Sequence, residues 1–311
     1  MESDRISDRA LAARITRTAS KQTYYTIRFL VDTGLAEDAY RAYAYFRWVD
    51  DWLDQEPRPR TERLAFVRRQ QVLMDGCYAQ RDRLAGLTPE ECLLADLIQR
   101  DTAKDSGLRV YIRSMMAVMA FDADRRGRLI SQRELNDYTH WLAVAVTEAL
   151  HYFIGHNCAS PHSETRYMAV SGAHITHMLR DALEDAQAGY YNIPSEVIAA
   201  NGIAPWDVES SAYRDWVLER VGKARACFRM GRDYLAQVEN LRCRIAGYAY
   251  IHRFEAVLDA IERTGYVLQA RYPERKGGRQ EVQMIGWALW MALKKRRPAH
   301  RAGARKGQVE I

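Results

Sequence analysis

The chain has 311 residues, of which 48% are hydrophobic and 28% are charged, so it is a globular protein and not a disordered one. Its formal net charge is +6, but residues 294–311 alone hold seven basic residues against one acidic residue. Because these residues account for the whole excess, the body of the protein is neutral, which argues against a nucleic-acid-binding face. We expect residues 298–311 to form a disordered basic tail, with contact to anionic lipid as the alternative.

The sequence predicts a cytoplasmic protein. Its five cysteines are scattered and none forms a CxxC pair, which indicates neither a disulfide framework nor a zinc site. The first fifteen residues are charged and contain no apolar signal core. The most apolar late run, residues 284–293, is far shorter than the ~20 residues that span a bilayer. Peripheral membrane association through the basic tail is the alternative, and the oligomeric state cannot be deduced.

The eight prolines bound long segments with helical periodicity. No Asn-Gly or Asp-Gly turn stands between alternating apolar residues, as a hairpin would require. The pattern predicts helices over residues 8–30, 36–54, 60–80, 88–101, 106–127, 131–156 and 164–188, two or three within 207–268, and a last one over 280–296. No linker divides them, so we expect a single all-α domain over residues 1–297.

The helix predicted over residues 36–54 ends in three acidic residues, Asp50, Asp51 and Asp54. Asp50 and Asp54 are four residues apart, so their carboxylates lie on one face of the helix. Like charges at this density repel one another and favour a bound cation. Carboxylate oxygens are the ligands that Mg2+ takes together with the phosphates of a substrate.

A second acidic cluster lies in the helix predicted over residues 164–188. Asp181 and Asp185 are again four residues apart, Glu184 lies beside them, and His177 stands one turn earlier. The residues before this cluster are apolar on nearly all sides, which is typical of a buried helix, and buried carboxylates need cations. We expect His177 to contact a metal or a diphosphate, with a hydrogen-bonded core histidine as the alternative.

The two acidic clusters together suit the binding of a diphosphate. Metal ions would bridge the carboxylates to phosphate oxygens, and the neighbouring Arg47 and Arg180 would neutralise the remaining charge. A diphosphate held in this way is a good leaving group and would leave an allylic carbocation. Aromatic faces can shelter such a cation, and the candidates are Tyr24, Tyr25, Trp48, Tyr138 and Trp141.

These segments resemble the squalene/phytoene synthase family. Residues 40–54 are similar to its first aspartate-rich motif, and residues 179–185, followed by Gly189 and Ile193-Pro194, are similar to its second. Further similarities are Ser20-Lys21, Arg28, Tyr138 and residues 261–266, so the resemblance runs over about residues 15–297.

The resemblance implies the all-α isoprenoid synthase bundle, with both motifs facing a central cavity. It implies Mg2+ binding by Asp50, Asp51, Asp54, Asp181 and Asp185, with Glu184 in support. It further implies diphosphate contacts from Arg28, Arg47 and Arg180, with Asp50, Asp181 and Tyr138 as catalytic side chains. Typical members join two farnesyl (C15) or geranylgeranyl (C20) diphosphates head to head; use of NADPH stays open.

Several positions depart from the family pattern. Val144 and Thr147 replace small glycines of the central helix, and His174 and His177 replace a glutamine and an asparagine. The added bulk favours an alternative reaction, in which the enzyme cyclises one prenyl diphosphate or prenylates a small non-isoprenoid acceptor. A catalytically dead assembly or binding protein is a further alternative, but it would be expected to lose aspartates, and all five are present.

Overall fold

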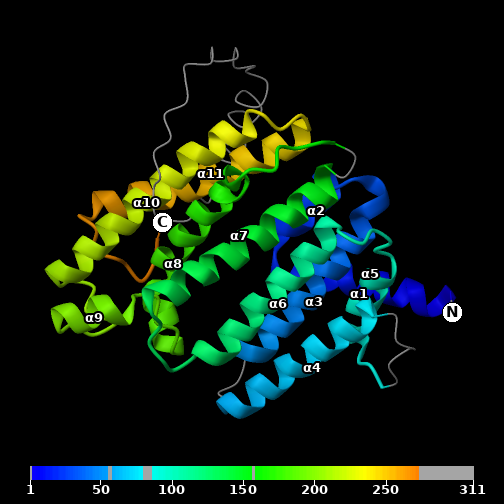
Figure 1. The fold of residues 1–311 in the computed structure, drawn as a ribbon, viewed down its shortest axis with the longest axis horizontal. Helices are drawn as coiled ribbons and strands as arrows, with labels where there is room; N and C mark the ends of the chain where they lie inside the picture. Colours follow the sequence, from blue (N-terminus) through cyan, green and yellow to red (C-terminus); the bar gives the residue numbers. More distant parts are fainter. Residues whose placement is uncertain (1, 55–57, 80–85, 156–157, 273–311) are drawn as a thin grey trace.

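A computed structural model describes residues 2–54, 58–79, 86–155 and 158–272 of the chain (Figure 1). The α-helices in these ranges are α1 (Glu2–Ala19), α2 (Lys21–Leu30), α3 (Ala36–Asp54), α4 (Arg60–Tyr78), α5 (Pro89–Gln99), α6 (Gly107–Arg125), α7 (Gln132–Gly155), α8 (Met168–Ala188), α9 (Ser195–Asn201), α10 (Ser211–Leu235) and α11 (Leu241–Arg263), with 3-10 turns η1 (Thr33–Leu35) and η2 (Glu164–Tyr167).

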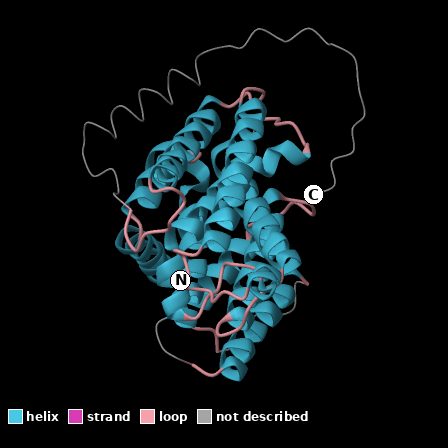
Figure 2. Ribbon diagram, turned by 90° about the vertical axis from the view of Figure 1, so that its left-hand side faces the viewer, coloured by secondary structure: helices cyan, strands magenta, loops and turns pink. Residues whose placement is uncertain are grey.

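The described ranges contain no strand, which confirms the all-α prediction (Figure 2). None of their helices is both long and apolar enough to cross a membrane. The helix predicted over residues 280–296 and the basic tail predicted over 298–311 lie outside the described residues.

The prediction of a single helix over residues 8–30 is wrong, because the helix is interrupted at Ser20. This residue has an extended backbone (φ −150°, ψ 102°), and its hydroxyl oxygen accepts the backbone N–H of Thr23 at 3.1 Å. A serine that caps the next helix in this way favours a new helix start over continuation of the old one. The chain therefore turns between α1 and α2, beside the first acidic cluster of α3.

The helices form a bundle in which α6 packs against α7, α4 and α3 (Figure 1). The second acidic helix, α8, packs between α7 and α10, and α11 covers both α7 and α8. A Cβ atom added at Gly231 would lie 2.7 Å from the backbone nitrogen of Ala169. One added at Gly172 would lie 2.9 Å from the Phe228 ring. Glycine thus permits the close contact by which α10 supports α8.

The C-terminal ends of α3, α6 and α8 meet at one place. The guanidinium of Arg126, just after α6, donates to the carbonyl oxygens of Leu53 and Ala188, each at 3.1 Å. The backbone N–H of Gly127 donates to the carbonyl oxygen of Gly189 at 2.7 Å. A cation at two helix C-termini is favourable, because it pairs with their unpaired carbonyl groups and the helix dipole. The ends that carry the two acidic clusters are therefore joined.

Candidate functional site

The first acidic cluster is linked to the segment that follows the second. The Tyr190 hydroxyl, two residues beyond α8, donates to Asp54 Oδ1 at 2.8 Å across a separation of 136 residues. The amide nitrogen of Asn192 donates to Asp185 Oδ2 at 2.6 Å. Both contacts come from the loop after α8, so this loop holds one carboxylate from each cluster.

A third carboxylate, Asp122 at the end of α6, lies between the two clusters. Burial raises the pKa of Asp50 to about 7, and the charges of Asp54 and Asp122 add to this effect. Burial also raises the pKa of Asp185 to about 6, with further contributions from Asp181 and Asp122. Because Asp122 acts on carboxylates of both α3 and α8, all of these groups share one electrostatic environment.

The Asp50 carboxylate is closely surrounded by protein and yet partly accessible to solvent. Its side chain keeps 39% of its surface exposed, yet burial is the largest cause of its raised pKa. Protein atoms therefore surround the Asp50 carboxylate closely, although solvent still reaches part of it. His177 on α8 is similar, because its side chain is 51% exposed while burial lowers its pKa.

The second cluster is paired with cationic side chains. The Arg180 guanidinium contacts both carboxylate oxygens of Asp181 at 2.6 Å, and His177 Nε2 lies 3.3 Å from Asp181 Oδ2. The charge of Arg253 on α11 also lowers the pKa of His177, so a further cation lies near this cluster. The guanidinium groups carry positive charge for an anionic ligand, whereas the lowered pKa of His177 leaves its imidazole neutral and able to donate one hydrogen bond.

A buried network joins Tyr138 to the second cluster. The Tyr138 hydroxyl donates to Asp122 Oδ2 at 3.0 Å, and Arg125 Nε donates to Asp122 Oδ1 at 2.7 Å. Arg125 also donates to Asn192 Oδ1 at 3.0 Å, and Asn192 in turn holds Asp185. The Arg125 guanidinium lies 4.8 Å from the ring centroid of Tyr138, within cation–π range. Burial raises the pKa of Tyr138 well above its ordinary value, so its hydroxyl keeps its proton.

Sequence reasoning missed Asp122, Arg125 and Asn192 as site residues. A signal for Asp122 was present, since it ends an apolar helix as Asp54 does. In the sequence, Asn192 lies just before the Ile193-Pro194 pair that follows the second motif, and no helical spacing marks it. Its contact with Asp185 depends on how the chain turns after Gly189, whose positive φ of 89° ends α8.

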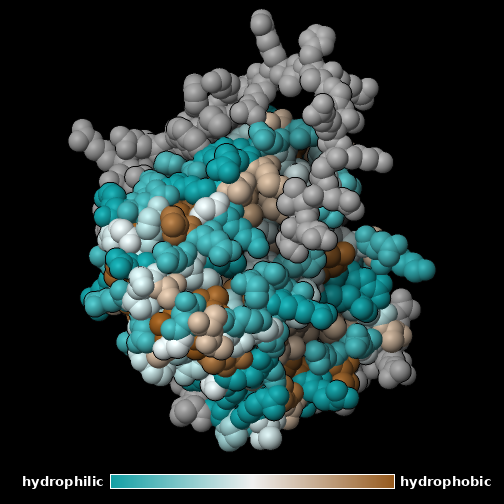
Figure 3. All heavy atoms as spheres, turned by 60° about the vertical axis from the view of Figure 1, so that its left-hand side comes forward, coloured by the Kyte–Doolittle hydropathy of each residue, from teal (hydrophilic) through white to brown (hydrophobic). Residues whose placement is uncertain are grey.

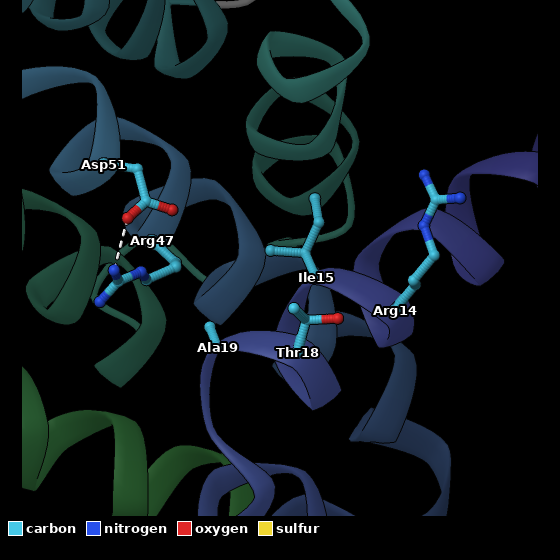
Figure 4. A pocket seen from close by; sticks show the side chains of 6 residues that line it. All are labelled: Arg14, Ile15, Thr18, Ala19, Arg47 and Asp51. Carbon is cyan, nitrogen blue, oxygen red and sulfur yellow. Dashed lines mark hydrogen bonds and ion pairs between the residues drawn. The ribbon is translucent and has the colours of Figure 1, made fainter. Parts of the chain in front are cut away.

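Arg47 and Asp51 line a pocket of about 400 Å³ on the α1 side of α3 (Figure 4). Arg47 pairs with Asp51 and lies 3.3 Å from Asp50, so it borders both the pocket and the first cluster. The opposite wall comes from the end of α1 and is formed by Arg14, Ile15, Thr18 and Ala19. The lining therefore carries two guanidinium groups and the Asp51 carboxylate, which Arg47 already contacts.

The predicted aromatic residues do not all lie at the site. Tyr138 is buried beside Phe121, with ring centroids 5.1 Å apart, and Trp141 packs on the same Phe121 at 6.1 Å. Trp48 instead contacts Phe66 of α4 at 5.4 Å, inside the scaffold.

The aromatic residues of α2 either pack on α3 or are exposed. Tyr24 packs against Tyr40 of α3 with centroids 5.6 Å apart. Tyr25 is 50% exposed and stacks on Phe29. Arg28 is also exposed, and its Cζ lies 5.8 Å from the Phe29 ring centroid. The structure therefore groups Tyr138 and Trp141 near the acidic clusters and leaves Tyr25 and Arg28 on the surface of α2.

Two residues that depart from the family pattern are buried with an unpaired polar atom. His174 is 6% exposed and lies beside Tyr138, with ring centroids 4.9 Å apart. Its Nε2, like the hydroxyl oxygen of the buried Thr147, has no hydrogen-bond partner in the part of the chain described. Burial is the main cause of the low pKa of His174, with His177 and Arg125 adding to it, so its imidazole is neutral.

The acidic side chains fit a divalent cation that also binds a ligand. The candidate donors other than His177 are carboxylate oxygens, and burial, together with their mutual repulsion, raises the pKa of Asp50 and Asp185. Within the described ranges, no three His, Cys, Asp or Glu side chains are close enough to form a metal site by themselves. Mg2+ typically completes its coordination with water and substrate phosphates, so this donor set suits Mg2+ together with a diphosphate.

The raised pKa of Asp50 predicts a pH-dependent stability. Ordinary aspartate has a pKa of about 4, so between pH ~4 and ~7 the folded chain binds more protons than the unfolded chain. The stability that Asp50 contributes is therefore present below pH ~4 and is lost as the pH rises through about 7. We expect Asp50→Asn to raise the melting temperature of the metal-free protein more at pH 8 than at pH 5. An equal shift at both pH values would contradict a raised pKa of Asp50.

The geometry defines a class of protein, an all-α bundle in which carboxylates and arginines of separate helices meet at one end. The sequence profile of the squalene/phytoene synthase family matches residues 16–277, so the chain belongs to this family and is an enzyme of the prenyltransferase type. A comparison with curated proteins finds no significant match.

Solved structures agree on the fold. The chain is similar to a dehydrosqualene synthase in complex with ligand, with a TM-score of 0.67 and 16% identity over 91% of this chain and 95% of that one. It is also similar to squalene synthase HpnC from Alicyclobacillus acidocaldarius, with a TM-score of 0.65 and 18% identity over 85% of this chain and 96% of that one. The predicted isoprenoid synthase fold is therefore confirmed.

Proposed function

We propose that the protein is a Mg2+-dependent prenyltransferase that ionises an allylic isoprenoid diphosphate and condenses two farnesyl or geranylgeranyl diphosphates head to head. The observation that carries this proposal is that the loop after α8 contacts both clusters, through Tyr190 to Asp54 and through Asn192 to Asp185, while the buried Asp122 acts on carboxylates of both α3 and α8. One electrostatic environment for both clusters supports one shared metal–diphosphate site. The family membership supports the reaction class.

In this proposal the carboxylates of the two clusters bind the metal. Asp50 and Asp54 of α3 and Asp181 and Asp185 of α8 hold Mg2+, which neutralises the leaving diphosphate when bound. Asp51 and Glu184 support the same metal set.

The cationic side chains bind the diphosphate oxygens. Arg47 and Arg180 are the main contacts, since their ion pairs with Asp50 and Asp181 place both guanidinium groups beside the proposed metal ligands. His177 donates from the turn before Asp181, and Arg28 reaches the diphosphate only from the exposed face of α2.

Tyr138 acts on the reacting carbon skeleton and not on the metal. Its ring lies between Arg125 and His174, and its hydroxyl is held by Asp122. A fixed aromatic ring in a buried position stabilises a carbocation by cation–π attraction. Burial also excludes the water that would otherwise quench the cation. Trp141, which packs on the same Phe121 as Tyr138, supplies a second aromatic ring. Tyr24 on α2 is the remaining aromatic candidate for sheltering the carbocation.

The unpaired polar atoms of His174 and Thr147 favour a second candidate function. Buried polar atoms without partners are costly, and a hydroxyl or carbonyl group of a ligand would satisfy them. A purely hydrocarbon chain would not. The alternative that these atoms favour is therefore an enzyme that prenylates a small polar acceptor; cyclisation of a single prenyl diphosphate is the other alternative, and these atoms do not favour it.

Product analysis of the purified protein tests the proposal. The protein is incubated with Mg2+ and C15 or C20 diphosphate, each alone and with candidate acceptors, with and without NADPH. We expect diphosphate release and a head-to-head C30 or C40 hydrocarbon from one of the two substrates. A cyclic or acceptor-linked product would support the alternative, and no consumption of any prenyl diphosphate would overturn the proposed function.

A further inference from the structure

The exposed face of α2 carries two neighbouring aromatic rings. Phe29 is 67% exposed and Tyr25 is 50% exposed, one turn apart on the helix. Their rings stack with centroids 6.1 Å apart and planes inclined by only 11°. The opposite face of α2 is anchored by Ile27, which is 6% exposed and belongs to the core. The helix is thus fixed to the bundle by one side and presents an aromatic pair on the other.

The segment that carries this pair is basic, and Arg28 lies against the Phe29 ring. Residues 10–31, which cover the end of α1 and all of α2, contain four basic residues and no acidic residue. All four, Arg14, Arg17, Lys21 and Arg28, are exposed. Elsewhere on the described surface, basic and acidic side chains lie together, as in the ion pairs of Arg225 with Asp259 and Glu262. The face seen in Figure 3, turned from that of Figure 1, likewise shows apolar groups only in separate patches among hydrophilic ones.

We propose that the aromatic pair of α2, Tyr25 and Phe29, and the four exposed basic residues on α2 and the end of α1 form a docking surface for an anionic lipid bilayer. Aromatic side chains bind at the level of the lipid headgroups, where their rings are partly withdrawn from water. Lysine and arginine beside them are attracted to anionic headgroups. The cations favour an anionic partner, and the two exposed rings favour one with an apolar layer, so an anionic bilayer fits this surface better than an acidic protein surface does.

The position of the surface gives docking a consequence. Ala19, which lines the pocket between α1 and α3, precedes the Ser20 cap, and α2 begins at the next residue. A bilayer bound to α2 would lie beside the pocket that Arg14 and Arg47 line. An amphiphile with an anionic head and a long apolar tail could then pass between bilayer and protein with little exposure to water.

Vesicle co-sedimentation of the full chain tests this surface without substrate. The vesicles are pure phosphatidylcholine, or equal parts of phosphatidylcholine and phosphatidylglycerol. We expect binding to the anionic vesicles only. Phe29→Ser should weaken it about tenfold or more by removing one exposed ring, and Arg17→Gln should weaken it about fivefold by removing one charge.

Matched controls lie at the other end of the molecule. Trp206, after α9, is 60% exposed, and Arg214 on α10 is exposed; Figure 1 shows α9 far from α2. Trp206→Ser and Arg214→Gln should leave binding unchanged. The proposal is overturned if these controls weaken binding as much as the α2 variants do. It is also overturned if Arg296→Gln with Arg297→Gln abolishes binding while Phe29→Ser keeps it, because the basic tail would then be the lipid contact.

A second copy of the chain is the other possible occupant of the surface. Sedimentation velocity without lipid separates the two cases. We expect Phe29→Ser to leave the oligomeric state unchanged, and a dimer that dissociates in this variant would overturn the proposal. Because binding is read without any prenyl diphosphate, its failure would leave the proposed reaction untouched, and an inactive protein could still bind vesicles.

Discussion

Asp181→Asn is expected to lower the rate of diphosphate release by about 10²–10³-fold, the usual effect of losing one group that stabilises transition-state charge. Asp181 is the carboxylate that both Arg180 and His177 contact, and its charge also acts on Asp185. The amide keeps the size of the side chain and removes the charge that a divalent cation needs. The measurement is release of inorganic diphosphate from a C15 or C20 substrate at saturating Mg2+.

The control for this variant is Asp215→Asn on α10, an exposed aspartate outside the site. It should keep the activity and melting temperature of the wild type. If Asp181→Asn kept full activity while it remained folded, α8 would not contribute to metal binding and the proposed roles of the second cluster would be wrong.

Gly231→Ala is expected to destabilise the protein by roughly 1–3 kcal/mol, the usual cost of overpacking a well-packed core. The new methyl group would lie 2.7 Å from the nitrogen and 2.8 Å from the Cα of Ala169. These are backbone atoms, so the contact is relieved only if α8 moves away from α10. The measurement is urea unfolding followed by helical circular dichroism. We also expect activity to fall, because α8 carries the second acidic cluster.

Gly222→Ala in the same helix is the matched control. A Cβ atom at Gly222 meets no atom within 4 Å, and the residue is exposed. Here alanine should stabilise the protein by about 0.5–1 kcal/mol through the lower entropy of the unfolded chain. Equal effects of the two substitutions would show that α8 and α10 are not in close backbone contact at Gly231.

The helices could be predicted from the sequence because apolar periodicity and proline positions are local signals. The error at Ser20 has a local cause as well, since the side chain of Ser20 caps α2 and its backbone leaves the helical region. The order of packing, with α8 between α7 and α10, depends on contacts such as that of Gly231 with Ala169. No local pattern predicts which glycine meets which helix.

The acidic clusters were found from the sequence because each repeats a carboxylate at a helical spacing. Asp122 and Arg126 were missed, since their importance lies in what they connect: Asp122 acts on both clusters, and Arg126 binds the ends of α3 and α8. The aromatic candidates were chosen by residue type alone. For that reason the set included Trp48, which packs on Phe66, and Tyr25, which is exposed.

The central claim is that the clusters of α3 and α8 form a single site, and a double-mutant cycle on diphosphate release tests it most directly. The rates of Asp50→Asn, Asp181→Asn and the double variant are compared with the wild type. Residues that act as one unit are strongly non-additive, so we predict that the double variant is little slower than either single variant. Losses that multiply, as for two independent sites, or full activity of Asp50→Asn, would contradict the claim.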